Sequence, residues 1–291
     1  MKHKSGFVNI IGNPNVGKST FMNELIGQKL SIITNKAQTT RHRIIGILND
    51  ENYQIVFSDT PGVIHPEYKL QESMMKSVNS AFIDADILIY MLEVGEKELK
   101  NKSLFERIKK LNLPLIILLN KIDLKDQEFV SNEILLWKEV FKNAYIFPIS
   151  ALNNFNLQNV KDKIIELLPV SPPYYSKDAI TDKSERFFIE EIIREKILKH
   201  YKQEIPYSVE VEVEEFIDKK EIVEIRANIY VLRESQKGIL IGHKGMGLKR
   251  IGTESRKDIE KMLDKKIVLK TPIKVRKNWR DNASQLKKFG Y

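Results

Sequence analysis

Apolar residues in the first 168 positions gather in short runs that alternate with longer stretches of helical spacing. The runs are bounded by Gly, Pro, Asn or Asp and predict strands at 7–11, 44–48, 54–58, 87–92, 115–119 and 144–149. Apolar residues three or four apart predict amphipathic helices at 18–26, 69–82, 99–111, 128–141 and 157–168. This alternation predicts an α/β domain over 1–168 with a doubly wound, mostly parallel sheet, which binds ligands at the carboxyl ends of its strands.

The pattern stops at PVSPPYY, residues 169–175, where three prolines fall within five positions and neither a helix nor a central strand can continue. We therefore expect a linker at 169–180. Beyond it, residues 181–291 predict a second, α+β domain: a helix at 184–200, strands at 209–216 and 222–232, two helical segments between 235 and 263, and a basic strand at 267–275. Two domains also agree with the length of 291 residues, which is more than one core usually holds.

The charge is concentrated at one end of the chain. The whole sequence has 48 basic and 39 acidic residues, whereas residues 231–291 have 17 and 6. Such a basic region predicts a polyanionic partner, with nucleic acid as the simplest candidate and an anionic membrane surface as the alternative. The absence of cysteine excludes disulfides and thiolate zinc sites. No apolar run is long enough to cross a bilayer and no signal-peptide core develops, so we expect a cytoplasmic protein.

The sequence GNPNVGKS at 12–19 matches the phosphate-loop pattern G-x-x-x-x-G-K-[ST] directly after the first predicted strand. In this pattern backbone amides close around the β-phosphate, Lys18 neutralises phosphate oxygens and Ser19 ligates Mg²⁺. The pattern alone leaves ATP and GTP open. The predicted phosphate site consists of Gly12, Asn13, Pro14, Asn15, Val16, Gly17, Lys18, Ser19 and Thr20.

The sequence NKID at 120–123 favours guanine as the base. The carboxylate of Asp123 can accept hydrogen bonds from N1–H and the exocyclic amino group of guanine, and adenine offers no such pair of donors. The stem of Lys121 would lie along the base, and Asn120 would tie this loop to the phosphate loop. Three residues after the next strand would complete the pocket, with the middle amide facing guanine O6: Ser150, Ala151 and Leu152.

Two further segments are expected to respond to the γ-phosphate. In the sequence DTPG, Asp59 would hold a Mg²⁺-bound water and the amide of Gly62 would bind the γ-phosphate, with Thr60 and Pro61 beside the nucleotide. In QTTRH at 38–42, one threonine hydroxyl would complete the Mg²⁺ shell, and we favour Thr40 over Thr39. Loss of these contacts on hydrolysis would release both segments.

The order of these motifs resembles that of translation-factor-like GTPases, and GNPNVGKST, QTTRH and DTPG are similar to those of the Era branch, with its TrmE-Era-like GTPase domain. The resemblance implies GTP hydrolysis, with catalytic roles for Lys18, Asn15, Thr40 and Gly62. Val63 stands where Ras-like proteins use a glutamine to position water. The resemblance also implies that Asn15 binds K⁺ in place of an arginine finger; the alternative is that Asn15 only caps the loop.

The sequence GHKG at 242–245 lies between the two helical segments of the basic region. A G-x-x-G loop lets a single-stranded nucleic-acid backbone approach closely, although alone it is more often an ordinary helix turn. SQKGILIGHKG and KNWRD resemble the type-2 KH domain of Era proteins, so the resemblance covers essentially the whole chain. Trp279 is expected either to stack on a base or to pack in the core. The predicted RNA contacts are Ile239, Ile241, Gly242, His243, Lys244, Gly245, Lys249, Arg250, Lys274, Arg276, Lys277 and Arg280.

The resemblance implies a monomeric GTPase that binds the 3′ end of 16S ribosomal RNA and assists biogenesis of the 30S ribosomal subunit. One alternative hypothesis is a regulatory GTPase that acts on a protein partner or peripherally at the inner face of the cell membrane, with the basic domain on anionic lipid. A second alternative, a metabolic ATP-binding enzyme, is disfavoured by Asp123.

Overall fold

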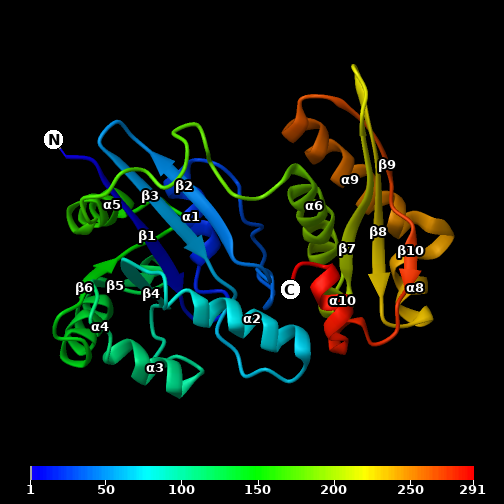
Figure 1. Cartoon of the computed structure of the whole chain (residues 1–291). Coiled ribbons are helices and arrows are strands. Elements are labelled where there is room, and N and C mark those ends of the chain that lie inside the picture. The colour runs from blue at the N-terminus through cyan, green and yellow to red at the C-terminus, as the bar shows by residue number, and fades with distance from the viewer. Residues whose placement is uncertain (1) are drawn as a thin grey trace. The chain divides into compact units, whose positions relative to one another are not determined.

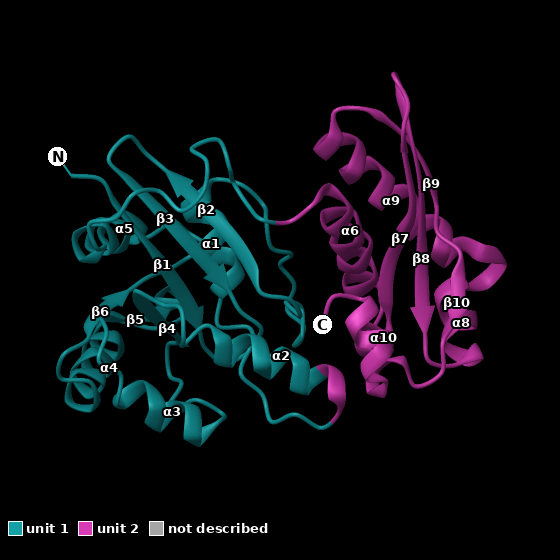
Figure 2. Cartoon of the chain, viewed as in Figure 1, with its two compact units in different colours: residues 1–67, 71–182 teal, residues 68–70, 183–291 magenta. Residues whose placement is uncertain are grey.

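The computed structural model describes residues 2–291, which form two compact units (Figures 1 and 2). The first unit comprises the residues up to 67 and residues 71–182, and the second comprises residues 68–70 and 183–291. The predicted fold class is confirmed, because a parallel-rich α/β sheet in the first unit is followed by a separate α+β unit.

The first unit is built on a six-stranded sheet in the order β2-β3-β1-β4-β5-β6, in which only the β2–β3 pair is antiparallel. Its strands are β1 (Lys4–Ile11), β2 (Ile44–Asn49), β3 (Tyr53–Asp59), β4 (Ile87–Glu93), β5 (Leu115–Asn120) and β6 (Tyr145–Pro148). Its helices are α1 (Lys18–Ile26), α2 (Lys69–Ser80), α3 (Lys102–Lys109), α4 (Gln127–Val140) and α5 (Leu157–Leu167).

Burial on both faces explains the apolar composition of the central strands. Strand β5 is buried at every position, and β4 at all but its last, as expected for strands covered by helices on both sides. On one face, Met75 of α2, Leu104 of α3 and Trp137 of α4 pack with Tyr90 of β4 in a single apolar cluster. The ring centroids of Tyr90 and Trp137 lie 6.0 Å apart, edge to face. The sheet is thereby a rigid support for the loops at its strand ends.

The segment expected to be a linker, 169–180, lies against the first unit. The side-chain oxygen of Gln54 in β3 accepts hydrogen bonds from the amides of Tyr174 and Tyr175 (2.7 and 3.0 Å). The amide of Ile47 in β2 donates to the carbonyl of Ile180 at 2.8 Å. The prolines exclude a helix here as predicted, but the backbone groups they leave unpaired find partners on the sheet. The boundary between the units accordingly falls after residue 182.

The second unit combines helices with a small sheet in which β8 pairs with β7 antiparallel and with β9 and β10 parallel. Its strands are β7 (Glu210–Asp218), β8 (Ile222–Val231), β9 (Lys266–Lys270) and β10 (Ile273–Val275). Its helices are α6 (Glu185–His200), α7 (Ile205–Ser208), α8 (Glu234–Ile241), α9 (Met246–Leu263) and α10 (Ala283–Lys288). The single strand expected at 267–275 is divided into β9 and β10 because Pro272 has no amide to donate.

One acidic side chain of α6 is held in a buried setting. Glu190 accepts a hydrogen bond from the amide of Val213 (2.7 Å), beside the irregularity in β7. Burial raises the pKa of Glu190 to about 7, and the neighbouring carboxylates of Glu210, Glu191 and Glu212 act in the same direction. The proton on Glu190 therefore contributes to the stability of this unit.

None of the helices within residues 2–291 is long and apolar enough to cross a membrane.

Candidate functional site

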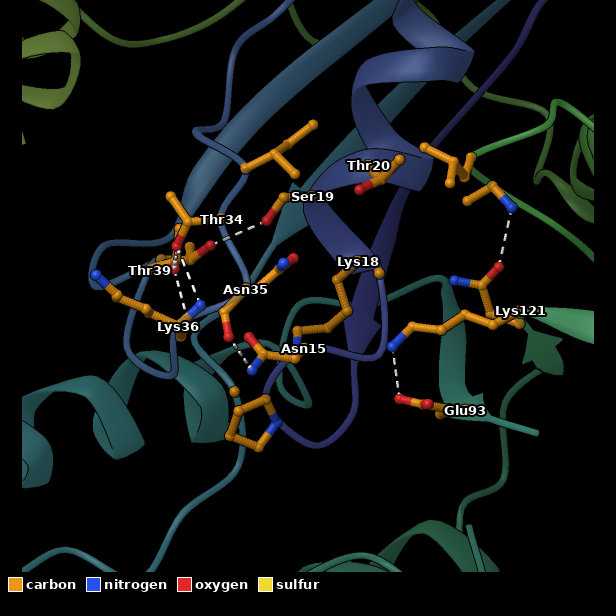
Figure 3. Close-up of a pocket in the computed structure, with 18 of the residues that line it drawn as sticks. Asn15, Lys18, Ser19, Thr20, Thr34, Asn35, Lys36, Thr39, Glu93 and Lys121 are labelled. Carbon is orange, nitrogen blue, oxygen red and sulfur yellow. Dashed lines mark hydrogen bonds and ion pairs between the residues drawn. The ribbon is translucent and has the colours of Figure 1, made fainter. Parts of the chain in front are cut away.

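A cavity of about 540 Å³ in the first unit brings the predicted nucleotide motifs together (Figure 3). The predicted residues that line it are Pro14, Asn15, Gly17, Lys18, Ser19, Thr20, Thr40, Gly62, Asn120, Lys121, Asp123, Ser150, Ala151 and Leu152. The predicted residues outside the lining are Gly12, Asn13, Val16, Asp59, Thr60 and Pro61. The cavity lies where β1, β5 and β6 end, so the parallel sheet itself gathers motifs that are far apart in the sequence.

The phosphate loop joins β1 to α1 through a left-handed turn. Gly17 has φ 105°, and a Cβ built there would lie 2.2 Å from Nδ2 of Asn120. Lys18 opens α1 and is 6% exposed, and its Nζ donates to the carbonyls of Gly12 (3.2 Å) and Asn13 (2.8 Å). The ammonium group thus lies inside the loop that would surround a phosphate, although it is now held by backbone oxygens.

Burial lowers the pKa of Lys18 to about 8, an effect that the negative charges of Asp59 and Glu96 partly oppose. Burial also raises the pKa of Asp59, and the charge of Lys18 opposes that shift. Lys18 in the lining of the cavity and Asp59 behind it are therefore two ionisable groups of opposite type that burial has removed from water. Anionic phosphates together with a divalent cation would compensate both.

Three oxygen ligands meet at the base of the phosphate loop. Oγ of Ser19 donates to Oδ2 of Asp59 at 2.7 Å, and Oγ1 of Thr40 lies 3.0 Å from Ser19 Oγ and 3.3 Å from Asp59 Oδ2. Hydroxyl and carboxylate oxygens are the ligands that Mg²⁺ prefers, so this donor set fits that ion. The hydroxyl of Thr39 is turned away from these oxygens, because it donates to the carbonyl of Lys36 (2.6 Å) and lies 2.6 Å from the hydroxyl of Thr34. The geometry favours Thr40, as expected from the sequence.

Asn120 connects the base loop to two other loops. Its Nδ2 donates to the carbonyl of Val16 at 2.7 Å, and its Oδ1 accepts from the amide of Ala151 at 2.9 Å. The first bond is the tie to the phosphate loop that the sequence predicts. The second bond occupies the Ala151 amide, which is predicted to face guanine O6, and that prediction is not tested by this contact. Nζ of Lys121 donates to the carboxylate oxygen Oε2 of Glu93 at 2.5 Å (Figure 3).

Two predicted nucleotide residues turn their side chains away from the cavity. The hydroxyl of Thr60 donates to the carbonyl of Ile10 at 2.6 Å. The side-chain oxygen of Asn13 accepts from the amide of Lys100 (2.9 Å), and its Nδ2 donates to the carbonyl of Glu98 (3.1 Å) and to the carboxylate of Glu96. Only the backbones of Asn13 and Thr60 are therefore placed to serve the site.

The loop that follows β4, residues 93–101, supports the cavity and was not identified from the sequence. Besides Asn13 and Lys121, it is bound by Glu133 of α4, whose two carboxylate oxygens accept from the amide of Gly95 (3.0 and 2.8 Å). Glu133 is buried on the same face of α4 as Val130 and Trp137. That single acidic residue on the inner face of a helix was the available signal, and no motif surrounds it.

The residues assigned to catalysis differ in their surroundings. Asn15 is exposed, has φ 66°, and donates through Nδ2 to the carbonyl of Asn35 at 3.0 Å (Figure 3). Gly62 packs against Pro14, since an added Cβ would lie 2.7 Å from the Pro14 Cα. Val63 is fully buried in the core, so its side chain is not directed at the cavity. The two segments expected to switch thus both touch the phosphate loop.

The GHKG sequence forms a short turn between α8 and α9 in the second unit. Gly242 has φ 70° and ψ 180°, a region open essentially to glycine alone. His243 and Lys244 are exposed at the tip, and Gly245 leads into α9 with φ 77°. Gly247, which the sequence analysis did not single out, allows α9 to approach α8 closely, since a Cβ there would lie 2.8 Å from the carbonyl oxygen of Leu240. The two middle residues of the turn are therefore exposed, and the two glycines are partly exposed.

Some of the predicted RNA contacts are exposed and others are partly buried. Ile239 is 49% exposed, and Lys249 and Arg250 are exposed on α9, whereas Ile241 packs partly on the core. Lys277 is exposed and Arg280 is partly buried. These positions border the turn or follow β10.

Three residues near the C-terminal strand are engaged within the unit. Lys274 forms an ion pair with Glu214 at 3.3 Å, and Arg276 stacks on the ring of Tyr230 at 4.1 Å. Trp279 is fully buried, and its Nε1 donates to the carbonyl of Ser208 at 3.1 Å. Trp279 is consequently a core residue and not a stacking platform.

Comparisons with known proteins agree with both units. Residues 7–121 match the family described as a 50S ribosome-binding GTPase, and residues 204–280 match the KH domain. The chain is 42% identical to GTPase Era from Thermoanaerobacter sp. (strain X514) over 294 residues, covering 100% of this chain and 97% of that protein. It is 41% identical to GTPase Era from Staphylococcus haemolyticus (strain JCSC1435), covering 100% and 98%.

Two solved structures share the fold over nearly the full length. One is a crystal structure of Era in complex with MgGDPNP and nucleotides 1506–1542 of 16S ribosomal RNA, with a TM-score of 0.95, 36% identity and 99% of each chain covered. The other is a variant of Aquifex aeolicus Era bound to GDP and aluminium fluoride, with the same TM-score, identity and coverage. The predicted resemblance is therefore confirmed over both units.

Proposed function

The chain belongs to the Era family of GTPases, and from that premise we propose that it is a GTP-driven switch that binds the 3′ end of 16S ribosomal RNA and assists biogenesis of the 30S subunit. The observation that carries the proposal is the presence, in one chain, of a cavity lined by the phosphate-loop and NKID residues and of a G-x-x-G turn whose two middle residues are exposed. A relative of the same fold holds MgGDPNP and a 16S ribosomal RNA fragment together.

The phosphate loop and Lys18 would supply most of the charge stabilisation during hydrolysis. Developing negative charge on the phosphates would meet the buried ammonium of Lys18 and the amides that open α1. Ser19, Thr40 and Asp59 would hold Mg²⁺, which neutralises phosphate charge when it is bound. Because Val63 is buried, no side chain at that position aligns the attacking water.

Guanine specificity would depend on the carboxylate of Asp123, which lines the cavity beside Lys121. Replacing Asp123 by Asn exchanges one acceptor for a donor, so the pocket should prefer xanthine, which carries an oxygen in place of the exocyclic amino group. Titration of the D123N variant with GDP and with xanthosine diphosphate should show weaker binding of the first and tighter binding of the second. Unchanged GDP affinity would remove Asp123 from base recognition.

A potassium ion beside Asn15 would supply the positive charge that an arginine finger gives in other GTPases. The exposed side chain of Asn15 lies next to the carbonyl of Asn35, so an amide oxygen and a backbone oxygen are close enough to share a cation after rotation of the amide. We expect faster turnover in K⁺ than in Na⁺, and loss of that difference in Asn15→Ala. Equal rates in the two salts would favour the capping role of Asn15.

The G-x-x-G turn would bind the backbone of single-stranded RNA. Gly242→Asp adds a negative charge and a side chain at a position with φ 70°, so it should weaken RNA binding while leaving GDP affinity unchanged. Gly252→Asp is a matched control, because it adds the same charge on α9, where the nearest atom to a new Cβ is 3.8 Å away. Equal RNA affinity of the Gly242 and Gly252 variants would exclude a special role for the turn.

We further propose that the protein acts in the cytoplasm, where its ribosomal target lies. We propose that it acts as a monomer, because residues of one chain form both candidate ligand sites. The competing assignment is a peripheral association with the inner face of the cell membrane through the basic residues of 231–291. Co-sedimentation with phosphatidylserine vesicles, with and without competing ribosomal RNA, separates the two. Vesicle binding that RNA does not displace would favour the membrane.

A further inference from the structure

A closed polar cluster lies beyond the nucleotide cavity, at the start of β2. Arg43 immediately precedes β2, and its Nε donates to the hydroxyl of Ser58 at 2.5 Å. Its two Nη atoms donate to the two carboxylate oxygens of Asp84 at 2.7 and 3.0 Å, and Nη2 also donates to Oδ1 of Asn9 at 3.1 Å. We call Asn9, Arg43, Ser58 and Asp84 the Arg43 clasp.

Asn9 closes the clasp from the opposite side. Its Nδ2 donates to Oδ1 of Asp84 (2.7 Å) and to the carbonyl of Ala81 (2.7 Å). Asn9 and Ser58, which are paired in register on the neighbouring strands β1 and β3 (Figure 1), are fully buried, and the side chain of Arg43 is only 17% exposed. The side chain of Asp84 is 44% exposed, so the fixed geometry of Arg43 comes from the bidentate pairing together with the buried Asn9 and Ser58, and a lysine cannot reproduce it.

The clasp joins the ends of the segments expected to switch. Arg43 lies three residues after Thr40, and Ser58 directly precedes Asp59, so both are one short step from the proposed Mg²⁺ ligands. Asp84 and Ala81 follow α2, the helix into which the DTPG segment continues. None of the clasp residues lines the nucleotide cavity. Their effect on the nucleotide must therefore pass through Thr40 and Asp59.

We propose that Arg43 and Asp84 are positioning residues for the GTP-bound state: they fix the start of β2 so that Thr40 stays beside Ser19 and Asp59. This inference depends on the proposed role of Thr40 as a ligand of Mg²⁺ when GTP is bound. Because the diphosphate state does not need Thr40, loosening the clasp should weaken binding of GTP selectively. A residue that only stabilised the fold would weaken GDP and GTP equally.

The test is the ratio of affinities for a non-hydrolysable GTP analogue and for GDP, measured with Mg²⁺ on the full chain. Arg43→Lys keeps the charge but loses the forked geometry, and Asp84→Asn loses the charged acceptor. Each should lower the affinity for the analogue by about tenfold, from the loss of charge-assisted hydrogen bonds, and that for GDP by less than twofold. The double variant should be little worse than either single one.

Two matched variants control for general effects near the clasp. Arg107→Lys alters an arginine that stacks on Phe82 just after α2 without reaching Arg43. Asp86→Asn alters a carboxylate that accepts from the amide of Phe7, two residues from Asp84. Neither control should change the ratio of affinities. If Arg43→Lys does not fold, Asp84→Asn carries the test.

Thr40→Ala separates failure of the clasp from failure of the assignment on which it depends. If Thr40→Ala lowers the ratio and the clasp variants do not, the clasp hypothesis is wrong and the role of Thr40 stands. If Thr40→Ala leaves the ratio unchanged, both are wrong. Faster amide hydrogen exchange of residues 36–44 in the GTP-analogue complex of Arg43→Lys, relative to the Arg107→Lys control, would support positioning.

Discussion

Replacing Asn120 by Ala should uncouple the three loops that surround the nucleotide. Asn120 is 2% exposed and its side chain holds the Val16 carbonyl at 2.7 Å and the Ala151 amide at 2.9 Å. Alanine removes both of these side-chain hydrogen bonds and needs no change of backbone conformation. The variant leaves one acceptor and one donor of the main chain buried, on the phosphate loop and on the loop after β6.

The cost can be worked from those two groups. A buried polar group left without its hydrogen bond costs about 1–3 kcal/mol, and entry of water reduces the sum, so unfolding free energy should fall by about 2–4 kcal/mol. Nucleotide binding needs both loops in register. If at least about 1.4 kcal/mol of this loss reduces the free energy of GDP binding, the affinity for GDP falls by tenfold or more.

Urea unfolding of the nucleotide-free protein and titration with a fluorescent GDP measure the two effects separately. Asn159→Ala is the matched control, because Asn159 is exposed on α5 and its Nδ2 donates to the side-chain oxygen of Asn156 (2.7 Å). Its unfolding free energy should change by less than about 0.5 kcal/mol. An Asn120→Ala protein that matches this control in both assays would show that Asn120 does not hold the loops together.

Three further outcomes follow from named contacts. The folded protein keeps a proton on Glu190 up to about pH 7, whereas the unfolded chain releases it near pH 4.5, so the unfolding free energy should fall by up to about 3 kcal/mol as the pH rises between these values. Urea unfolding at pH 5 and pH 8 should show a smaller fall in Glu190→Gln than in the unmodified protein. An equal fall in the two proteins would assign the pH dependence to another group. Gly17→Ala places a Cβ 2.2 Å from Nδ2 of Asn120 at φ 105°, so GDP titration should show more than a tenfold loss; near-normal affinity would mean that the loop relaxes freely. Trp279→Phe loses the bond to the Ser208 carbonyl and should lower unfolding free energy by about 1–2 kcal/mol without changing RNA affinity, whereas a selective loss of RNA binding would restore the stacking role.

Much of the nucleotide site could be predicted from the sequence because local spacing determines it. A phosphate loop must join a strand to a helix, and parallel strands end at one edge, so Lys18, Ser19 and Asp123 had to converge once the strands were identified. The hydroxyl of Thr40 lies beside Ser19, which agrees with the preference for Thr40 over Thr39, and its role as a ligand of Mg²⁺ stays a prediction. Family resemblance extended this to the KH unit, where spacing alone was weak.

The directions of individual side chains could not be predicted, because partners distant in sequence determine them. Asn13 belongs to the phosphate-loop motif, yet its side chain is held by the loop after β4, and Arg276 belongs to a basic run, yet it stacks on Tyr230. The prolines after 168 excluded a helix, but nothing in their spacing shows that Gln54 binds the backbone that follows. Hydrogen-bond partners supplied by tertiary structure leave no periodic trace in the sequence.

Coupling between the nucleotide and RNA is best tested by the binding of a short single-stranded RNA that carries the 3′-end sequence of 16S ribosomal RNA. Its affinity should be measured with GDP and with a non-hydrolysable GTP analogue, against a scrambled RNA of the same composition and length. The proposed function predicts tighter, sequence-selective binding in the GTP-analogue state. Equally weak binding of both RNAs in both states, falling steeply with salt, would contradict it and leave the basic unit as a general polyanion-binding surface.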